Sequence, residues 1–132
     1  MNRLRMFFLM RIRAIGYALH GWWYVLRTQR NAWIHALATF LAVLVAAWLR
    51  LPARDWAVLV LTIALVWTAE FINTALEAVV DLASPQHHPL ARVGKDVGAA
   101  AVLIAALTSI VIGLLILGPP LWSRLQALFP NS

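Results

Sequence analysis

Three long apolar runs constrain the fold of this chain more than any other feature of its sequence. They cover about residues 32–50, 56–82 and 97–118, and a helix of about 20 apolar residues crosses a hydrocarbon core about 30 Å thick. Of the 132 residues, 63% are hydrophobic and 12% are charged, whereas soluble domains carry about 25% charged residues. We therefore expect a single all-α integral membrane domain over residues 1–132, with three transmembrane helices.

The residues before the first run, about 1–30, mix apolar and aromatic side chains with arginines. The arginines are Arg3, Arg5, Arg11, Arg13, Arg27 and Arg30. A helix of this composition lies in the membrane interface, with its aromatic rings in the acyl boundary and its arginines toward the headgroups. We therefore predict an N-terminal amphipathic surface helix. Gly16 and Gly21 leave open whether it is one segment or two.

Lysine and arginine are distributed unevenly between the two ends of the predicted spans. Eight of the 11 lie in the N-terminal segment and the second connection, and three lie in the first connection and the tail. Because cytoplasmic segments carry the excess of these residues, we expect a bacterial inner-membrane protein with a cytoplasmic N-terminus and its C-terminus outside. The basic residues form no stripe with interleaved exposed aromatics, so nucleic acid is not an expected partner.

Glycines and prolines mark the expected connections. Residues 84–96 are predicted to form a loop, and the Gly-Pro-Pro sequence at 118–120 is predicted to end the third helix. Gly94 and Gly98 form a G-x-x-x-G pattern, which favours close packing between helices.

The second apolar run carries a stripe of polar side chains near its C-terminal end. Glu70, Asn73, Glu77 and Asp81 are spaced by three, four and four residues, which places them on one side of an α-helix. A carboxylate in a hydrophobic span costs at least about 2.5 kcal/mol to insert. The stripe is therefore expected to face a bundle interior or a water-filled site, at the cytoplasmic end of the helix.

This set of side chains suits phosphoryl transfer, which needs a metal, a cation on the phosphates and a base for the attacking hydroxyl. Glu70 lies deepest in the span and is the best candidate for the base. Glu77 and Asp81, nearer water, suit contact with Mg²⁺ and a nucleotide. Lys95 and Asp96 arrive from the next connection and supply the cation and a further acidic group.

Several segments together resemble a known family. They are Gly16-Tyr17, RNAWIH at 30–35, AEFINTALEAVVDL at 69–82, HPLARVGKD at 88–96 and AAAVLIAAL at 99–107. The chain resembles the small trimeric prokaryotic lipid kinases that include diacylglycerol kinase and undecaprenol kinase, and its RN-x-x-x-H and HPLA motifs are closer to the undecaprenol kinase branch. The resemblance implies an ATP-dependent kinase with three transmembrane helices and a surface helix in each subunit, assembled as a homotrimer with active sites between subunits.

The resemblance also assigns roles to individual residues. It implies Glu70 as general base, Asn73 on the phosphates, Glu77 as a Mg²⁺ ligand, Asp81, Lys95 and Asp96 as nucleotide-site residues, and Tyr17 as an adenine contact. One position departs from the family pattern, because its second metal-binding glutamate falls on Gln29 in this chain. Gln29 is neutral and binds Mg²⁺ poorly, so we expect the metal site to be reorganised or weakened.

Three other residues are candidates for contact with lipid or phosphate: Arg13, Arg30 and His35. For the arginines, a headgroup-facing position is the alternative. For His35, the alternative is a hydrogen-bonded histidine at the interface.

The sequence thus predicts a kinase that moves the γ-phosphoryl group of ATP, with Mg²⁺, to the hydroxyl of undecaprenol or diacylglycerol. The alternative is a catalytically impaired nucleotide- and lipid-binding membrane protein of the same fold. A proton-coupled transporter is disfavoured, because the first and third spans contain no acidic partner for the stripe and the chain has no inverted repeat.

Overall fold

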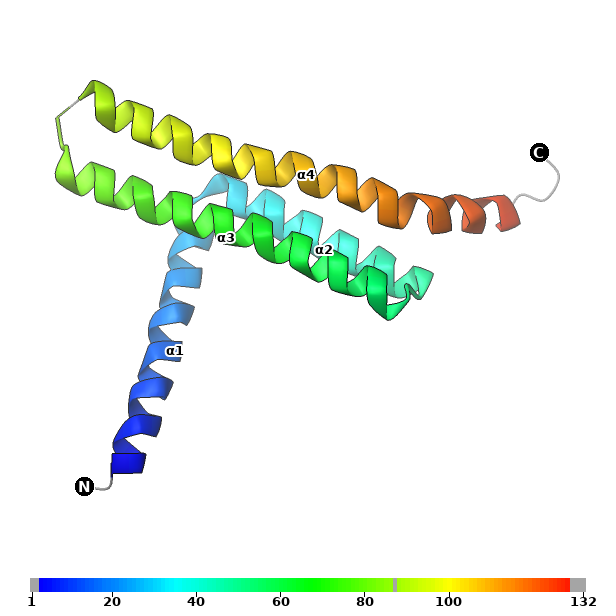
Figure 1. The fold of residues 1–132 in the computed structure, drawn as a ribbon, viewed down its shortest axis with the longest axis horizontal. Helices are drawn as coiled ribbons and strands as arrows, with labels where there is room; N and C mark the ends of the chain where they lie inside the picture. Colours follow the sequence, from blue (N-terminus) through cyan, green and yellow to red (C-terminus); the bar gives the residue numbers. More distant parts are fainter. Residues whose placement is uncertain (1–2, 87, 129–132) are drawn as a thin grey trace.

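The computed structural model describes residues 3–86 and 88–128, and these residues form four α-helices and no strand (Figure 1). The helices are α1 (Arg3–Thr28), α2 (Arg30–Leu49), α3 (Ala53–Ala83) and α4 (Pro89–Leu128). By length and composition, α2, α3 and α4 are each able to cross a membrane. The expected all-helical fold with three candidate membrane spans is therefore confirmed.

The three apolar helices form a small bundle from which α1 diverges. Helices α3 and α4 run side by side in opposite directions, α2 lies against α3, and α1 leaves the bundle at a steep angle (Figure 1). Helix α1 is one continuous segment, so Gly16 and Gly21 do not divide it. Among the described residues, nothing lies within 4 Å of a Cβ atom placed on either glycine, so neither marks a close contact with another helix.

Little of the apolar surface is buried within one chain. The most apolar window of α3 is 39% buried, against 17% for α2 and 11% for α4. Two small clusters account for most of the interior, one around Val25, Ala32 and Trp67 and one around residues 46, 51 and 59. Apolar surface left open on this scale needs lipid or another protein against it. The packing therefore supports a membrane setting.

Helix α4 begins earlier than the sequence indicated. It starts at Pro89, so the prediction of a loop over residues 84–96 was wrong for most of its length. Proline is well suited to the first helical position, because the N–H that it lacks would have no intrahelical acceptor there. As a consequence, Lys95 and Asp96 lie on a helix, in positions fixed relative to α3.

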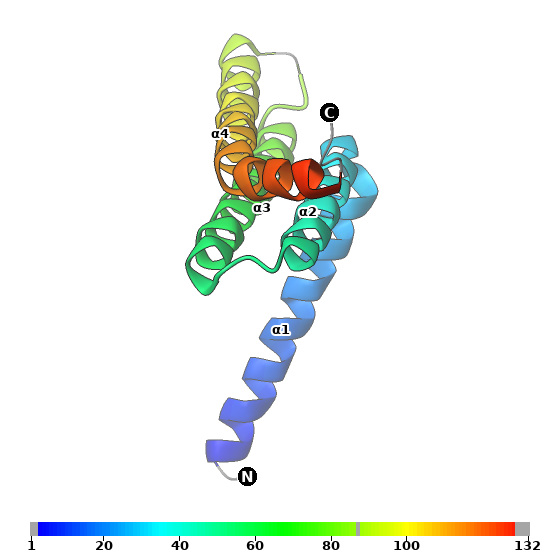
Figure 2. The same cartoon turned by 90° about the vertical axis from the view of Figure 1, so that its right-hand side faces the viewer.

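Helix α4 also ends later than predicted. It continues through Pro119 and Pro120 to Leu128, so the predicted stop at 118–120 was wrong. Each proline removes one backbone hydrogen bond and crowds the preceding turn, and the helix responds by bending instead of ending. Figure 2 shows this change of direction in the last turns of α4, drawn from orange to red.

The G-x-x-x-G pattern lies on the face of α4 that packs against α3. A Cβ atom placed on Gly98 would clash with Asn73 Oδ1 and lie 3.0 Å from Leu76 Cδ2, and one on Gly94 would lie 3.8 Å from Val80 Cγ2. The prediction of close helix packing is confirmed for Gly98, whereas a Cβ at Gly94 would meet only an ordinary van der Waals contact. Gly98 in particular leaves room for the amide of Asn73, a residue of the polar stripe.

We expect Gly98→Ala to lower the free energy of unfolding by about 1–3 kcal/mol, because the added methyl group overpacks the contact between α3 and α4. Gly113→Ala is the matched control, since no atom of the described residues lies within 4 Å of a Cβ at that position. The control should be neutral or slightly stabilising, because alanine favours helix over glycine by about 1 kcal/mol. Denaturant titration in detergent micelles, followed by circular dichroism, measures both. Equal stability of the two variants would contradict the close packing at Gly98.

Candidate active site

The polar stripe of α3 runs from the bundle interior to the exposed end of the helix. Glu70 is 1% exposed and Asn73 is 8% exposed, whereas Glu77 is half-buried and Asp81 is exposed. This order agrees with the expectation that Glu70 is the deepest of the four. The stripe therefore offers one desolvated carboxylate and, about two to three turns away, carboxylates that a solute can reach.

Glu77 accepts hydrogen bonds from two amides. Asn73 Nδ2 donates to Glu77 Oε1 at 3.0 Å, and Gln29 Nε2 donates to Glu77 Oε2 at 3.2 Å. Gln29 reaches α3 because it lies at the break between α1 and α2, where its backbone is extended with φ −103° and ψ 118°. The structure thus brings together Gln29 and Glu77, which the resemblance placed at one metal site.

The residues around Glu77 fit a metal ion that arrives with phosphates. Within residues 3–86 and 88–128, no group of three or more His, Asp or Glu side chains is placed to hold a metal ion. Mg²⁺ is commonly bound by one or two carboxylates together with substrate phosphates and water. Glu77 supplies one such carboxylate, and the Oδ1 atom of Asn73 is a buried oxygen that no described residue hydrogen-bonds. This donor set fits Mg²⁺ held jointly with a nucleotide.

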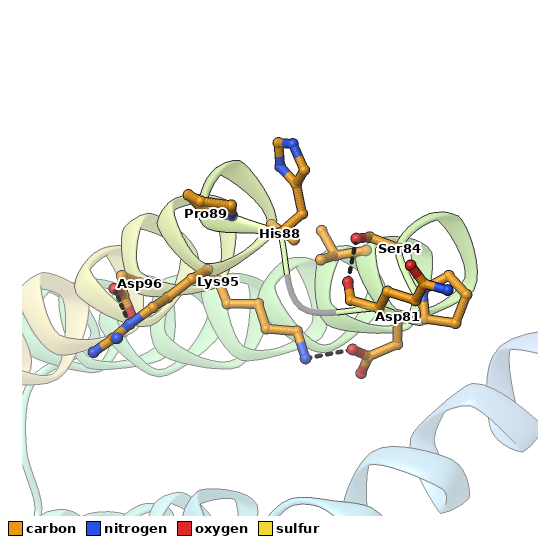
Figure 3. Close-up of a pocket in the computed structure, with 11 residues that line it drawn as sticks. Asp81, Ser84, His88, Pro89, Lys95 and Asp96 are labelled. Carbon is orange, nitrogen blue, oxygen red and sulfur yellow. Dashed lines mark hydrogen bonds and ion pairs between the residues drawn. The ribbon is translucent and has the colours of Figure 1, made fainter.

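A second polar group lies beyond Glu77, where α3 ends and α4 begins. Lys95 Nζ donates to Asp81 Oδ1 and forms an ion pair with it, and Arg92 Nε lies 3.8 Å from Asp96 Oδ2 one turn apart on α4. Figure 3 shows Lys95 reaching from α4 toward Asp81 at the edge of an open pocket of about 510 Å³, which is also lined by Ser84 and residues 85–89 apart from 87. Asp81, Lys95 and Asp96, three of the predicted nucleotide residues, therefore share one pocket.

Glu70 faces α2 at the deep end of the stripe, and a group of aromatic rings lies beside this contact. Its Oε2 atom lies 3.6 Å from Nε2 of His35. The ring of Trp67 lies 6.3 Å from that of His35 and 4.7 Å from that of Trp22, and Trp22 lies 4.6 Å from Phe71. The sequence marked His35 as a candidate but did not pair it with Glu70, since helical periodicity relates residues of one helix and not those of α2 and α3.

The remaining candidates are not brought to the stripe within one chain. Tyr17 and Arg13 lie on α1, where they line a shallow groove with Gly16 and His20, and Arg30 is exposed at the start of α2. Across the described part of the chain, no hydrogen bond or ion pair joins these three candidates to the stripe. Their predicted roles at the nucleotide, phosphates or lipid stay predictions.

Fold and site together define a helical membrane protein that gathers carboxylates, amides and a lysine at one end of its bundle. Comparison with known proteins narrows this class. The model of the prokaryotic diacylglycerol kinase family matches residues 16–117, and the chain belongs to that family. It is therefore a lipid kinase, a phosphotransferase with an alcohol acceptor.

Three relatives show how far the similarity extends. An undecaprenol kinase of Bacillus subtilis is 38% identical over 120 residues, which cover 91% of this chain and 94% of the relative. A diacylglycerol kinase of Escherichia coli is 36% identical over 107 residues, covering 76% of this chain and 82% of the relative. A diacylglycerol kinase of Synechocystis is 45% identical over 108 residues, covering 81% of this chain but 62% of the longer relative. The resemblance inferred from the motifs is thereby confirmed.

Proposed function

We propose that this protein transfers the γ-phosphoryl group of ATP to the primary hydroxyl of a membrane lipid, with undecaprenol or diacylglycerol as the acceptor. The observation that carries the proposal is the buried carboxylate of Glu70 about two turns from Glu77, whose carboxylate is held by two amides. The names of the relatives supply both acceptors. In this proposal the lipid hydroxyl approaches Glu70 from the membrane interior, and the nucleotide approaches Glu77 from the exposed end of α3.

In the proposed reaction, Glu70 takes the proton of the acceptor hydroxyl as its oxygen attacks the γ-phosphorus. A bond forms between the lipid oxygen and the γ-phosphorus, and the bond between the γ-phosphorus and the oxygen bridging to the β-phosphorus breaks. The products are a lipid phosphate and ADP, and the proton on Glu70 later returns to water. A buried carboxylate suits this role, because water does not compete with the hydroxyl for it.

Glu77 is the proposed Mg²⁺ ligand, and its two amide donors orient it. Asn73 and Gln29 each hold one oxygen of the carboxylate, so rotation of the Glu77 side chain is restricted. When bound, Mg²⁺ would neutralise charge on the phosphates. Gln29 adds no negative charge of its own, so the Mg²⁺ site of this chain is proposed to be weaker than one built from two carboxylates.

The pocket between α3 and α4 is the proposed nucleotide site, with Asp81, Lys95 and Asp96 in contact with ATP. Lys95 is free to exchange its exposed ion pair with Asp81 for a phosphate, because exposed ion pairs contribute little to stability. Phosphate recognition by a lysine is a charge-assisted contact of about 1.5–3 kcal/mol. The pocket therefore has the cation that the transferring group requires.

The assembly is proposed to be a homotrimer in the bacterial inner membrane, with the N-terminus cytoplasmic and the C-terminus outside. Large apolar side chains are exposed along α2 and α4, which leaves surface for neighbouring copies as well as for lipid. Helix α1 is proposed to lie on the membrane surface. In an assembly with sites between subunits, α1 of one copy brings Tyr17 and Arg13, and the start of α2 brings Arg30, to the site of another.

We expect Lys95→Met to raise the KM for ATP by about 10–100-fold, because the phosphates lose a charge-assisted contact. The melting temperature should change little, since the ion pair that is lost is exposed. Arg124→Met is the matched control, a cation removed from the far end of α4. Initial rates at varied ATP concentration measure the effect, and an unchanged KM would remove Lys95 from the nucleotide site.

A second candidate function follows from Gln29. A protein that keeps the fold and binds nucleotide and lipid, but has lost turnover, also accounts for a neutral residue at this position. The two candidates differ in the rate of labelled phosphate transfer by the purified protein.

An assay with both acceptors tests the proposed function. Purified protein in mixed micelles receives γ-labelled ATP, Mg²⁺ and either undecaprenol or diacylglycerol, and initial rates are compared. Transfer to at least one acceptor is expected, and the ratio of the two values of kcat/KM identifies the preferred lipid. Labelling of neither lipid by folded protein would leave the binding protein as the better description.

A further inference from the structure

His35 and Glu70 face each other inside the bundle with both polar atoms unpaired. His35 Nε2 and Glu70 Oε2 are 3.6 Å apart, too far for a hydrogen bond, and both atoms are buried with no hydrogen-bond partner among the residues that the structure describes. Buried polar atoms in folded proteins are rarely left unpaired, because each has lost its hydrogen bonds to water. The pair therefore requires an explanation beyond packing.

The neighbouring polar groups of the described residues are engaged elsewhere, which leaves His35 Nε2 and Glu70 Oε2 as each other's available hydrogen-bond partners. Thr74 Oγ1 donates to the backbone oxygen of Glu70 and not to its carboxylate. The indole N–H of Trp67 is turned to Thr39 Oγ1 at 3.2 Å, so it is not available to Glu70. The nearest other charge on α3, Glu77, has its two oxygens engaged by amides. Across the described residues, His35 is thus the one donor aimed at the buried oxygen of Glu70.

We propose that His35 is a positioning residue for Glu70, and this inference rests on the proposed function. His35 Nε2–H donates to Oε2 and fixes the plane of the carboxylate, which leaves Oε1 to take the proton of the acceptor hydroxyl. Hydrogen bonds of catalytic groups are often long before substrate binds and shorten in the complex. Closing the gap from 3.6 Å to hydrogen-bond range takes a movement of less than about 1 Å.

A cluster of aromatic rings lies beside the pair. Trp22, Trp67 and Phe71 form a cluster of tilted and edge-to-face rings with centroids 4.6–6.1 Å apart, and Trp67 stands edge-on to His35. These rings come from α1 and α3, and Trp67 is the one recorded beside His35. An apolar aromatic cluster therefore lies beside the His35 side of the contact.

Three substitutions at His35 separate positioning from packing. His35→Leu keeps the volume and removes the donor, and kcat should fall by about 10²-fold, the loss expected from misplacing a reacting group by about 1 Å. The KM for ATP should stay unchanged. His35→Gln places an amide N–H where Nε2 lies and should restore kcat to within about tenfold of the native value. His35→Asn, whose amide is too short to reach Glu70, should resemble His35→Leu.

A double-mutant cycle with Glu70→Asp completes the test. Shortening the carboxylate removes it from the reach of His35 while leaving a base, so His35→Leu should cost little more in that background. Equal losses in both backgrounds, or His35→Gln no better than His35→Leu, would make His35 a packing residue and overturn the proposal. The activity of the native protein is the reference. If the native protein does not phosphorylate lipid, the proposed function is refuted. If the native protein is active and His35→Leu leaves its kcat unchanged, only this inference is refuted.

Discussion

Glu70→Gln is expected to reduce lipid phosphorylation by about 10²–10⁴-fold, the contribution of a general base. Glutamine has nearly the shape of glutamate but cannot take the proton of the acceptor hydroxyl. The variant should still fold, because it removes a charge that is costly to bury and keeps oxygen and nitrogen atoms beside His35. Initial rates in micelles measure the loss, and circular dichroism verifies the helical content.

Asp55→Asn is the matched control for this prediction. Asp55 lies in the first turn of α3, so the same helix loses a carboxylate at its opposite end. The kcat of the Asp55→Asn variant should equal that of the native protein. Substantial lipid phosphorylation by the Glu70→Gln variant would mean that another group accepts the proton, and the role given to the stripe would have to be revised.

Gln29→Glu is expected to lower the Mg²⁺ concentration for half-maximal activity by about tenfold or more, since adding a carboxylate ligand strengthens the binding of a hard cation. The reason is geometric, because Gln29 Nε2 lies 3.2 Å from Glu77 Oε2 and the new carboxylate takes that place. Without Mg²⁺ the two carboxylates repel each other. The variant should therefore melt at a lower temperature than the native protein in a chelator and gain more stability when Mg²⁺ is added.

Gln126→Glu, an exposed change near the end of α4, controls for the added charge. The maximal rate distinguishes the kinase from the impaired binding protein. If Gln29→Glu lowers the Mg²⁺ concentration for half-maximal activity but leaves the maximal rate unchanged, the native protein is a working enzyme that binds its metal weakly. A large rise in the maximal rate would instead show that the native site is impaired. No change in Mg²⁺ dependence would remove Gln29 from the metal site.

The fold was largely predictable because hydrophobic length is a local property. The runs at about 32–50, 56–82 and 97–118 lie within α2, α3 and α4, apart from the residue that follows Leu49. Helix boundaries near prolines were less predictable, since a proline begins α4 at Pro89 while another, Pro119, lies inside it at a bend. Local sequence does not distinguish these outcomes, because they depend on whether packing and the surrounding lipid support the turns on either side.

The candidate site was predictable where its members share one helix. Spacing alone placed Glu70, Asn73 and Glu77 on one side of α3, and the structure keeps them there in order of depth. Contacts between helices were not predictable from spacing. The approach of Gln29 to Glu77 depends on an extended residue between α1 and α2, and that of His35 to Glu70 depends on how α2 lies against α3.

Transfer of label from γ-labelled ATP to lipid by purified native protein with Mg²⁺, measured in parallel with Glu70→Gln, is the most direct test of a lipid kinase that uses Glu70 as its base. We predict label in a lipid phosphate with γ-labelled ATP, none with α-labelled ATP, and almost none with the variant. Folded native protein that labels neither undecaprenol nor diacylglycerol, or a variant that labels lipid as fast as the native protein, would contradict this mechanism.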